Sequence, residues 1–230
     1  MKKLRILDIA FENEIFAYEI PALRGALISL VGRENVLFHN HLNKDYRFAY
    51  PLIQYKRIDK KPHLFCINQG VDEAHKFFIN KQEGLFLGSR PYELKVDAIH
   101  LYNQEINMNG TYHYYYLRDW LPLSQKNYSE YKNLETFSGK IKFLERILTG
   151  NILSFAKGIS WIIEDELKVH IIEMKHRHYV KVKKVNRLAL NLVFKSNMRL
   201  PDIIGLGKNA SLGFGIVKKI RSFEIGKGVC

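Results

Sequence analysis

The sequence predicts an α+β fold in which one order of strands and helices occurs twice. Two observations predict it: the succession of strand and helix patterns in the first half, and a shortened version of that succession in the second half. Four glycines close together near the C-terminus predict a loop within the second half. The first succession reads strand, helix, strand, strand, helix, strand, which is typical of the ferredoxin-like fold. We therefore expect two tandem ferredoxin-like domains, residues 1–107 and 108–230, the second with a C-terminal glycine-rich loop.

The elements of the first half follow from apolar periodicity and from turn-forming residues. Alternation predicts a strand over 3–10, and apolar residues on one face predict a helix over 19–31, with Pro21 near its start and Gly32 after its end. A polar loop is expected over 33–49. The other expected elements are a hairpin with its turn at 59–62, a second helix and a long strand: 51–58 with 63–68, 70–80 and 92–106.

The second half repeats this order in a less regular form. An aromatic strand is expected over 111–117, and Asn109-Gly110 before it is a strong signal for a hairpin turn. Apolar spacing predicts an amphipathic helix over 137–154. The remaining expected elements are a hairpin of 167–173 and 179–185 with its tip at 174–178, a strand at 188–194, one helical turn at 201–204 and a last strand at 213–220.

The chain is strongly basic, and the charge is concentrated towards the C-terminus. Its formal net charge is +13 and its pI is about 9.6. Residues 168–221 hold thirteen Lys and Arg against only Glu173 and Asp202, an excess of 11. Such an excess of one sign indicates binding to nucleic acid or to another anionic surface. The 13 Tyr and 14 Phe offer rings for base stacking as well as for the core.

Other classes of protein are disfavoured by what the sequence lacks. Its two cysteines, Cys66 and Cys230, form no CxxC unit, so neither a zinc site nor a disulfide framework is indicated. No apolar run reaches membrane-spanning length, and the N-terminus lacks the apolar stretch of a signal peptide. We therefore expect a cytoplasmic protein without membrane association.

Glycine recurs four times between residues 205 and 215, in a segment that also contains a lysine. Such a backbone takes positive φ or lets another group approach closely, and its N–H groups can hold a phosphate. Two nucleotide-binding motifs do not fit, because no helix follows the loop and Lys208 is followed by Asn209 in place of Ser or Thr. The loop is therefore predicted to bind a polyanion, with a ligand-free turn as the alternative. The predicted contacts are Gly205, Gly207, Lys208, Ser211, Gly213 and Gly215.

Two histidines separated by one residue, His39 and His41, are the strongest candidates for catalysis. They lie in the polar loop, and Tyr46, Tyr50 and Lys56 follow closely. Imidazoles exchange protons near neutral pH, so the pair could divide the roles of acid and base. RNA would supply its own nucleophile, the 2′-OH, and positive charge from Lys56 or a loop N–H would stabilise the phosphorane.

Two alternatives remain for this histidine pair. The two residues could be ordinary polar surface residues, or they could bind a metal together with a second pair, His176 and His178. Nothing in the spacing requires the pairs to meet, and zinc sites usually include Cys or carboxylate ligands as well. We therefore expect no metal, and we interpret the expected hairpin tip at 174–178 as a turn that faces RNA.

Four short segments in this order resemble one known family: LRG at 23–25, LFHNH at 37–41, YPLIQYK at 50–56 and SLGFG at 211–215. The family is that of the CRISPR repeat-processing endoribonucleases, the Cas six family of the RAMP superfamily. The resemblance extends over residues 3–221 and is closest to the b-type branch. The glycine loop alone indicates only the superfamily, whereas the second and third segments narrow the resemblance to the branch.

The resemblance implies two tandem ferredoxin-like (RRM-like) domains and a cofactor-free, metal-independent enzyme. It would cleave precursor CRISPR RNA within repeats by 2′-OH attack, leaving a 2′,3′-cyclic phosphate and a 5′-hydroxyl. The partner implied is CRISPR repeat RNA, with a CRISPR effector complex and a homodimer as further expectations. The alternative is a non-catalytic subunit of the same superfamily that binds CRISPR RNA without cutting it.

The resemblance also assigns roles to individual residues. The family's catalytic histidine follows the first helix, which places it at His39 or His41, and an assisting tyrosine would be Tyr50 or Tyr46. Outside the glycine loop, the residues expected to bind RNA are Arg24, Lys56, Lys175 and Arg177.

Overall fold

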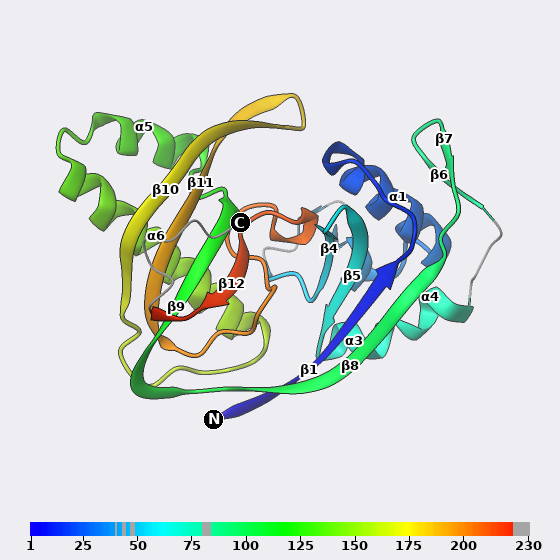
Figure 1. The fold of residues 1–230 in the computed structure, drawn as a ribbon, viewed down its shortest axis with the longest axis horizontal. Helices are drawn as coiled ribbons and strands as arrows, with labels where there is room; N and C mark the ends of the chain where they lie inside the picture. Colours follow the sequence, from blue (N-terminus) through cyan, green and yellow to red (C-terminus); the bar gives the residue numbers. More distant parts are fainter. Residues whose placement is uncertain (40, 43–44, 47–48, 80–83, 223–230) are drawn as a thin grey trace. The chain divides into compact units, whose positions relative to one another are not determined.

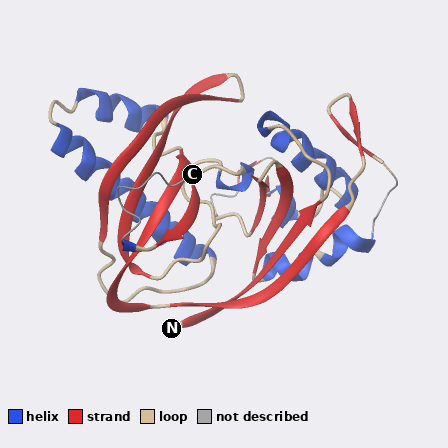
Figure 2. Cartoon of the chain, in the orientation of Figure 1, coloured by secondary structure: helices blue, strands red, loops and turns tan. Residues whose placement is uncertain are grey.

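The computed structural model describes residues 1–39, 41–42, 45–46, 49–79 and 84–222, without the side chains of 39, 41–42 and 45–46. The chain forms two compact units. We call Lys3–Gln104 with Ser211–Gly213 the N-terminal unit, and Met1–Lys2, Glu105–Ala210 and Phe214–Cys230 the C-terminal unit. Each unit contains a four-stranded sheet with helices (Figures 1 and 2), which confirms the predicted α+β class.

The sheet of the N-terminal unit has the strand order β4-β5-β1-β8, in which β5 pairs antiparallel with both β4 and β1. A helix between β1 and β4, and two more between β5 and β8, complete the ferredoxin-like order that the sequence predicts. The strands and helices are β1 (Lys2–Phe11), α1 (Ile20–Val31), β4 (Ile53–Ile58), β5 (Lys61–Ile67), α3 (Gln69–Glu73), α4 (His75–Ile79) and β8 (Val96–Ile106).

This unit also contains several short elements outside its four-stranded sheet and main helices. The predicted loop over 33–49 contains a helical turn and two strands of two residues, while a small hairpin precedes β8. The hairpin turn expected at 59–62 is only two residues long, because Asp59 and Lys60 both take positive φ (48° and 67°) and β5 begins at once. The short elements are η1 (Ala17–Glu19), α2 (Val36–His39), β2 (His41–Leu42), β3 (Asp45–Tyr46), β6 (Leu85–Leu87) and β7 (Arg90–Tyr92).

The sheet of the C-terminal unit has the order β10-β11-β9-β12, which matches the order of the first sheet strand for strand. The long helix α6 contacts β10, and its buried side chains lie every three or four residues. Between β11 and β12 the glycine-rich loop stands where the second helix would be. The elements are β9 (Met108–Trp120), α5 (Gln125–Asn133), α6 (Phe137–Gly158), β10 (Val169–Val182), β11 (Val185–Met198), η2 (Ala210–Leu212) and β12 (Ile216–Ile220).

The long hairpin of the C-terminal unit turns at a different place from the predicted one. Residues 174–178 lie inside β10, and pairing with β11 continues to Val182 opposite Val185. Lys183 and Lys184 form the tip, with φ of 49° and 65°. Register shifts near 172 and 175 break the alternation of side chains along β10. The sequence pattern therefore predicted a turn at a place where the strand continues.

Three further expectations were wrong. Asn109-Gly110 is not a hairpin turn, because both residues lie within β9, and β8 and β9 belong to different sheets. Residues 201–204 form no helical turn, since Ile203 has a φ of 67° and its amide donates a hydrogen bond to the carbonyl of Val217. The last strand begins at Ile216 and not at 213, because the glycines before it take positive φ.

Among the described residues, no helix is both long and apolar enough to cross a lipid bilayer.

Candidate functional site

The predicted catalytic histidines lie on the two short elements that follow α1. His39 is the last residue of α2, and His41 opens β2, where its backbone pairs with that of Tyr46. The side chains of these three residues lie outside the described part of the structure, as does residue 40. The backbone thus places His39, His41 and Tyr46 on neighbouring positions of one small substructure.

A buried tyrosine anchors this substructure to the sheet. Tyr55 of β4 is fully buried and donates a hydrogen bond of 3.0 Å from its hydroxyl to the carbonyl of Phe38, the residue before His39. Burial raises the pKa of Tyr55 well above its usual value, with the charge of Arg24 opposing the shift, so the hydroxyl keeps its proton. Arg24, expected to bind RNA, is half-buried on α1 beside this tyrosine.

Replacing Tyr55 with phenylalanine should lower the cleavage rate without lowering RNA affinity. The change removes the hydrogen bond to Phe38 and leaves a buried carbonyl without its donor, at a cost of about 1–3 kcal/mol. A misplaced catalytic group can lose about 10²-fold in rate, so the single-turnover rate should fall by up to that factor. Rate and binding are measured separately on repeat RNA.

Tyr92→Phe is the matched control, because the buried Tyr92 hydroxyl donates a similar bond, of 2.6 Å, to the carbonyl of Asn13. It should lower the melting temperature without slowing cleavage. Equal rates for Tyr55→Phe and wild type would show that this anchor does not position the histidine segment.

A buried polar chain links three residues of the YPLIQYK segment. The amide of Gln54 donates to the hydroxyl of Tyr50 at 2.8 Å, and the ammonium of Lys56 donates to the Gln54 carbonyl oxygen at 2.8 Å. Burial raises the pKa of Tyr50 above its usual range, so its phenol is neutral. Lys56 is fully buried, with its ammonium 5.1 Å from the centroid of the Phe65 ring. The structure thus places the charge of Lys56, a predicted RNA contact, inside the unit, and its contact with RNA stays a prediction.

The glycine-rich loop uses many of its backbone amides within the protein. The N–H groups of Leu206, Lys208, Phe214 and Gly215 donate to carbonyls of the same unit, at 2.8 to 3.4 Å. A phosphate could therefore be held only by other amides of the loop or by side chains. Gly205 and Gly215 are buried, so the structure does not place these two predicted contacts at the surface.

The glycines are required by close packing inside the protein. A Cβ on Gly207 would lie 2.7 Å from the indole nitrogen of Trp120 and 2.9 Å from the side-chain oxygen of Asn151, and its φ is 84°. A Cβ on Gly213 would lie 3.2 Å from the carbonyl of Tyr55. We expected a ligand to approach these positions, whereas here it is protein atoms that approach them.

Lys208 is the predicted contact that this loop presents to solvent. Its side chain is exposed, while its amide is fixed on the carbonyl of Leu121 at 3.3 Å. Ser211 is partly exposed, as is Lys175, whose ammonium lies 2.8 Å from a carboxylate oxygen of Glu173. Arg177 is exposed on β10.

Lys208→Ala should weaken RNA binding and leave the chemical step unchanged. Removing one phosphate contact should reduce the slope of log affinity against log salt by about 0.7–0.9. Affinity is measured over a series of salt concentrations, with Lys126→Ala, an exposed lysine of α5, as the matched control. Unchanged affinity and slope would show that the loop is a structural turn without a role in binding.

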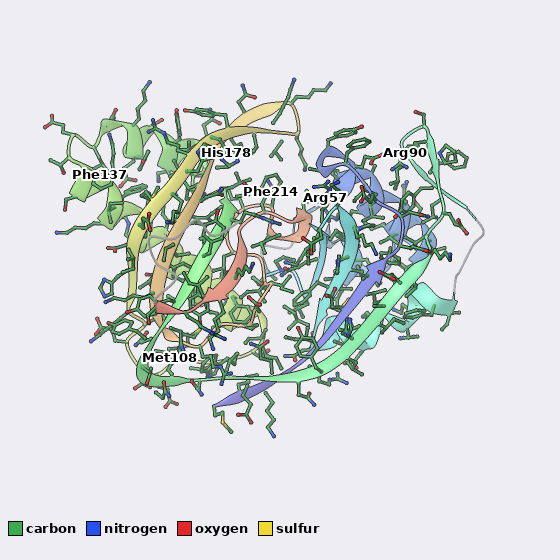
Figure 3. The ribbon with its side chains drawn as sticks, viewed as in Figure 1. Arg57, Arg90, Met108, Phe137, His178 and Phe214 are labelled. Atoms are coloured by element: carbon green, nitrogen blue, oxygen red, sulfur yellow. The ribbon has the colours of Figure 1, made fainter. Side chains whose placement is uncertain are left out.

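Sequence patterns did not predict a contact between His178 of β10 and Asp119 of β9. The His178 Nε2 lies 3.1 Å from a carboxylate oxygen of Asp119, and Asp119 has a φ of 51° (His178 is labelled in Figure 3). The ring of His176 stacks on that of His178 with centroids 5.1 Å apart. In the described part of the chain, no three His, Cys, Asp or Glu side chains are grouped to hold a metal ion.

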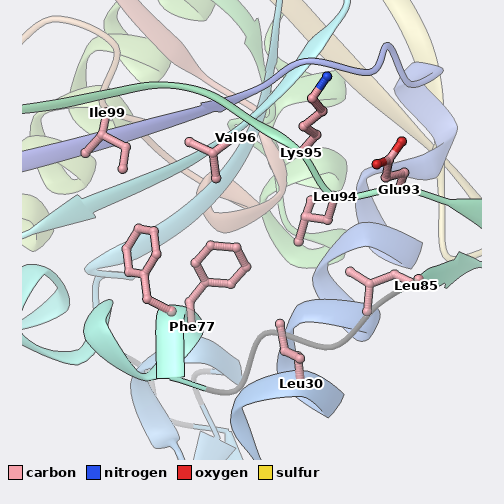
Figure 4. Close-up of a pocket in the computed structure, with 10 residues that line it drawn as sticks. Leu30, Phe77, Leu85, Glu93, Leu94, Lys95, Val96 and Ile99 are labelled. Carbon is pink, nitrogen blue, oxygen red and sulfur yellow. The ribbon is translucent and has the colours of Figure 1, made fainter.

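An apolar pocket of the N-terminal unit is separate from these residues (Figure 4). It lies between α1, α4 and β8 and is lined mainly by apolar side chains, among them Leu30, Phe77 and Ile99. Its lysine, Lys95, is paired with Glu12 at 2.6 Å. The pocket therefore offers little to attract a polyanion.

Comparison with known proteins identifies the family. Models of the Cas6b N-terminal and C-terminal domains match residues 2–105 and 107–220. A crystal structure of Cas6b superposes with a TM-score of 0.86 at 29% identity, and one of a CRISPR RNA processing endoribonuclease Cas6b with a TM-score of 0.74 at 26% identity. Each covers 95% of this chain and 100% of the solved chain.

A curated relative covers a shorter stretch. An uncharacterized protein of Methanocaldococcus jannaschii is 36% identical over 107 residues, which is 46% of this chain and 71% of the relative. Because the two domain models together cover almost the whole chain, and two Cas6b structures share its fold from end to end, the chain belongs to the Cas6b family, the b-type branch of Cas6.

Proposed function

We propose that this protein cleaves precursor CRISPR RNA within its repeats, without a metal ion, by attack of a ribose 2′-OH on the adjacent phosphate. The products are a 2′,3′-cyclic phosphate and a 5′-hydroxyl. The observation that carries this proposal is the match of both halves to Cas6b, one solved member of which is described as a CRISPR RNA processing endoribonuclease.

The reaction requires two proton transfers. The 2′-OH loses its proton to a base as its oxygen attacks phosphorus, and the leaving 5′-oxygen receives a proton from an acid as the P–O bond breaks. His39 and His41 are assigned these roles, because two imidazoles near neutral pH can hold one proton between them. Tyr50, kept neutral by burial, is the proposed assisting tyrosine.

Binding of the RNA is assigned to the basic C-terminal segment. The surplus of Lys and Arg over 168–221 attracts the phosphate backbone, and Lys208 and Arg177 present exposed side chains there. Arg24, Lys175, Ser211, Gly207 and Gly213 remain further proposed contacts. Assembly with a CRISPR effector complex or with a second copy, and residence in the cytoplasm, stay predictions from the sequence.

The experiment that tests the absence of a metal requirement is cleavage of CRISPR repeat transcripts in excess EDTA. We expect cleavage to continue at the rate seen without the chelator, because histidine acid–base chemistry needs no metal ion. Loss of activity that Mg²⁺ or Mn²⁺ restores would contradict the proposal.

A second candidate function is binding of CRISPR RNA without cleavage. The burial of Lys56 and Tyr50 favours it, because two side chains expected near the scissile phosphate are engaged inside the unit. Tight, salt-dependent binding of repeat RNA with no product in single-turnover conditions would identify this function.

A further inference from the structure

We propose that Asp119, His178 and His176 form a stacking platform for one unpaired nucleobase of the bound RNA. We call these three residues the imidazole platform. This inference rests on the proposed binding of RNA and adds a position at which a base is held. It requires neither the histidine pair of the N-terminal unit nor cleavage.

The inner end of the platform is fixed by Asp119. Its carboxylate lies 3.1 Å from Nε2 of His178, its amide donates to the Asn191 side-chain oxygen at 2.6 Å, and its carbonyl accepts from the amide of Gly215 at 3.1 Å. Aspartate tolerates the left-handed backbone that this position has. Asp119 therefore has a defined position before any ligand binds.

His178 reaches this carboxylate across the intervening strand. Its partner in the β10–β11 register is Ala189, whose side chain is small and fully buried. Little of the side chain at 189 stands between the imidazole and β9, where Asp119 lies. The ring of His178 is 29% exposed, so it is partly covered and held at one end.

His176 forms the outer layer of the platform. Residues two apart on a strand share a face, and the rings of His176 and His178 are stacked with an interplanar angle of 19°. His176 is exposed, in contrast to the ring beneath it. The ring of His176 is held in place by the ring of His178 and is open to solvent on its other side. A further flat ring can therefore stack on it with little loss of side-chain entropy.

A nucleobase fits this arrangement better than a metal ion or a phosphate. Imidazole lone pairs lie in the ring plane, so two nearly parallel stacked rings do not converge on one ion. A phosphate beside His178 would be repelled by the Asp119 carboxylate. Every nucleobase presents a π-face whatever its identity, so stacking on His176 would tolerate any base.

The test uses CRISPR repeat RNA in which 2-aminopurine replaces each base in turn. With wild-type protein, stacking should quench fluorescence at one unpaired position. His176→Ala should abolish that quenching and weaken binding about 5- to 150-fold, the range of base–aromatic stacking. His176→Phe should retain both, because it keeps a flat ring. Asp119→Asn keeps a residue suited to positive φ but removes the carboxylate beside His178, so it should give a smaller loss.

The control is His100→Ala, which removes an exposed histidine from β8 of the N-terminal unit, and the melting temperature of each variant verifies folding. Unchanged affinity and quenching in folded His176→Ala would overturn the platform, as would equal losses in His176→Ala and His176→Phe. Cleavage by wild type together with the first of these results would leave the proposed function standing. Binding and quenching without cleavage would support the platform and contradict the nuclease.

Discussion

His41→Ala is expected to lower the single-turnover cleavage rate by about 10²–10⁴-fold, the usual contribution of one general acid or base. His39→Ala should have an effect in the same range. We expect the larger loss at His41, because its backbone pairs directly with that of Tyr46. RNA affinity should change little, since neither histidine needs a charge to hold the backbone.

The position of the two histidines explains why both should matter. The helical turn α2 ends at His39 and the strand β2 begins at His41, so the two histidines lie at adjoining ends of consecutive elements. The Tyr55 hydroxyl donates a hydrogen bond to the carbonyl of Phe38, the residue before His39. In the proposed reaction both histidines act on one phosphate, with one holding a proton and the other lacking it.

Rates are measured with enzyme in excess over repeat RNA, and His75→Ala, an exposed histidine of α4, is the matched control. That control should cleave like wild type. A double variant of His39 and His41 that cleaves at the wild-type rate would place the catalytic site elsewhere, with His176 and His178 as the next residues to replace.

A single 2′-deoxy substitution at the nucleotide 5′ to the cut should abolish cleavage. The proposed reaction takes its nucleophile from the RNA, so removal of that oxygen leaves no attacking group. Binding should be nearly unchanged, because the phosphate backbone that dominates affinity is intact.

The sequence predicted the topology of the N-terminal unit well. The predicted ends of the first strand and the first helix differ from the observed ends by no more than one residue. The signals used there, apolar alternation with Pro21 and Gly32, depend only on neighbouring residues. The hairpin at Asp59 was also found, though its turn is shorter than expected. Local turn chemistry and periodicity therefore predicted the order of the main strands and helices, but not the short elements within 33–49, the division of the helix expected at 70–80 into α3 and α4, or the start of β8 at Val96.

The C-terminal unit shows where such signals fail. The strand β10 contains two register shifts, so its side chains do not alternate regularly and the pattern suggested a turn near His176. The true tip consists of Lys183 and Lys184, residues that rarely signal a tight turn. Asn109-Gly110 has a strong turn sequence yet lies within β9, since tertiary pairing overrides the local preference.

The sequence allowed candidate site residues to be chosen by residue type, but not their burial or their contacts. The sequence singled out Lys56, but only the structure shows that its ammonium is buried on Gln54. From the sequence, the glycines were expected to make room for a ligand. In the structure, Gly207 is required because a Cβ there would collide with Trp120. The contact between Asp119 and His178 joins residues 59 positions apart across an intervening strand, which no local pattern reveals.

The central claim is that the RNA's own 2′-OH is the nucleophile. The most direct test compares cleavage of two repeat RNAs that differ only in the 2′-OH at the nucleotide before the cut, in excess EDTA and with enzyme in excess. The account predicts that the all-ribose RNA is cut to a 2′,3′-cyclic phosphate and a 5′-hydroxyl. The deoxy RNA should be bound with nearly equal affinity and remain whole. Cleavage of both substrates at the same rate would show that water is the nucleophile and would contradict the account.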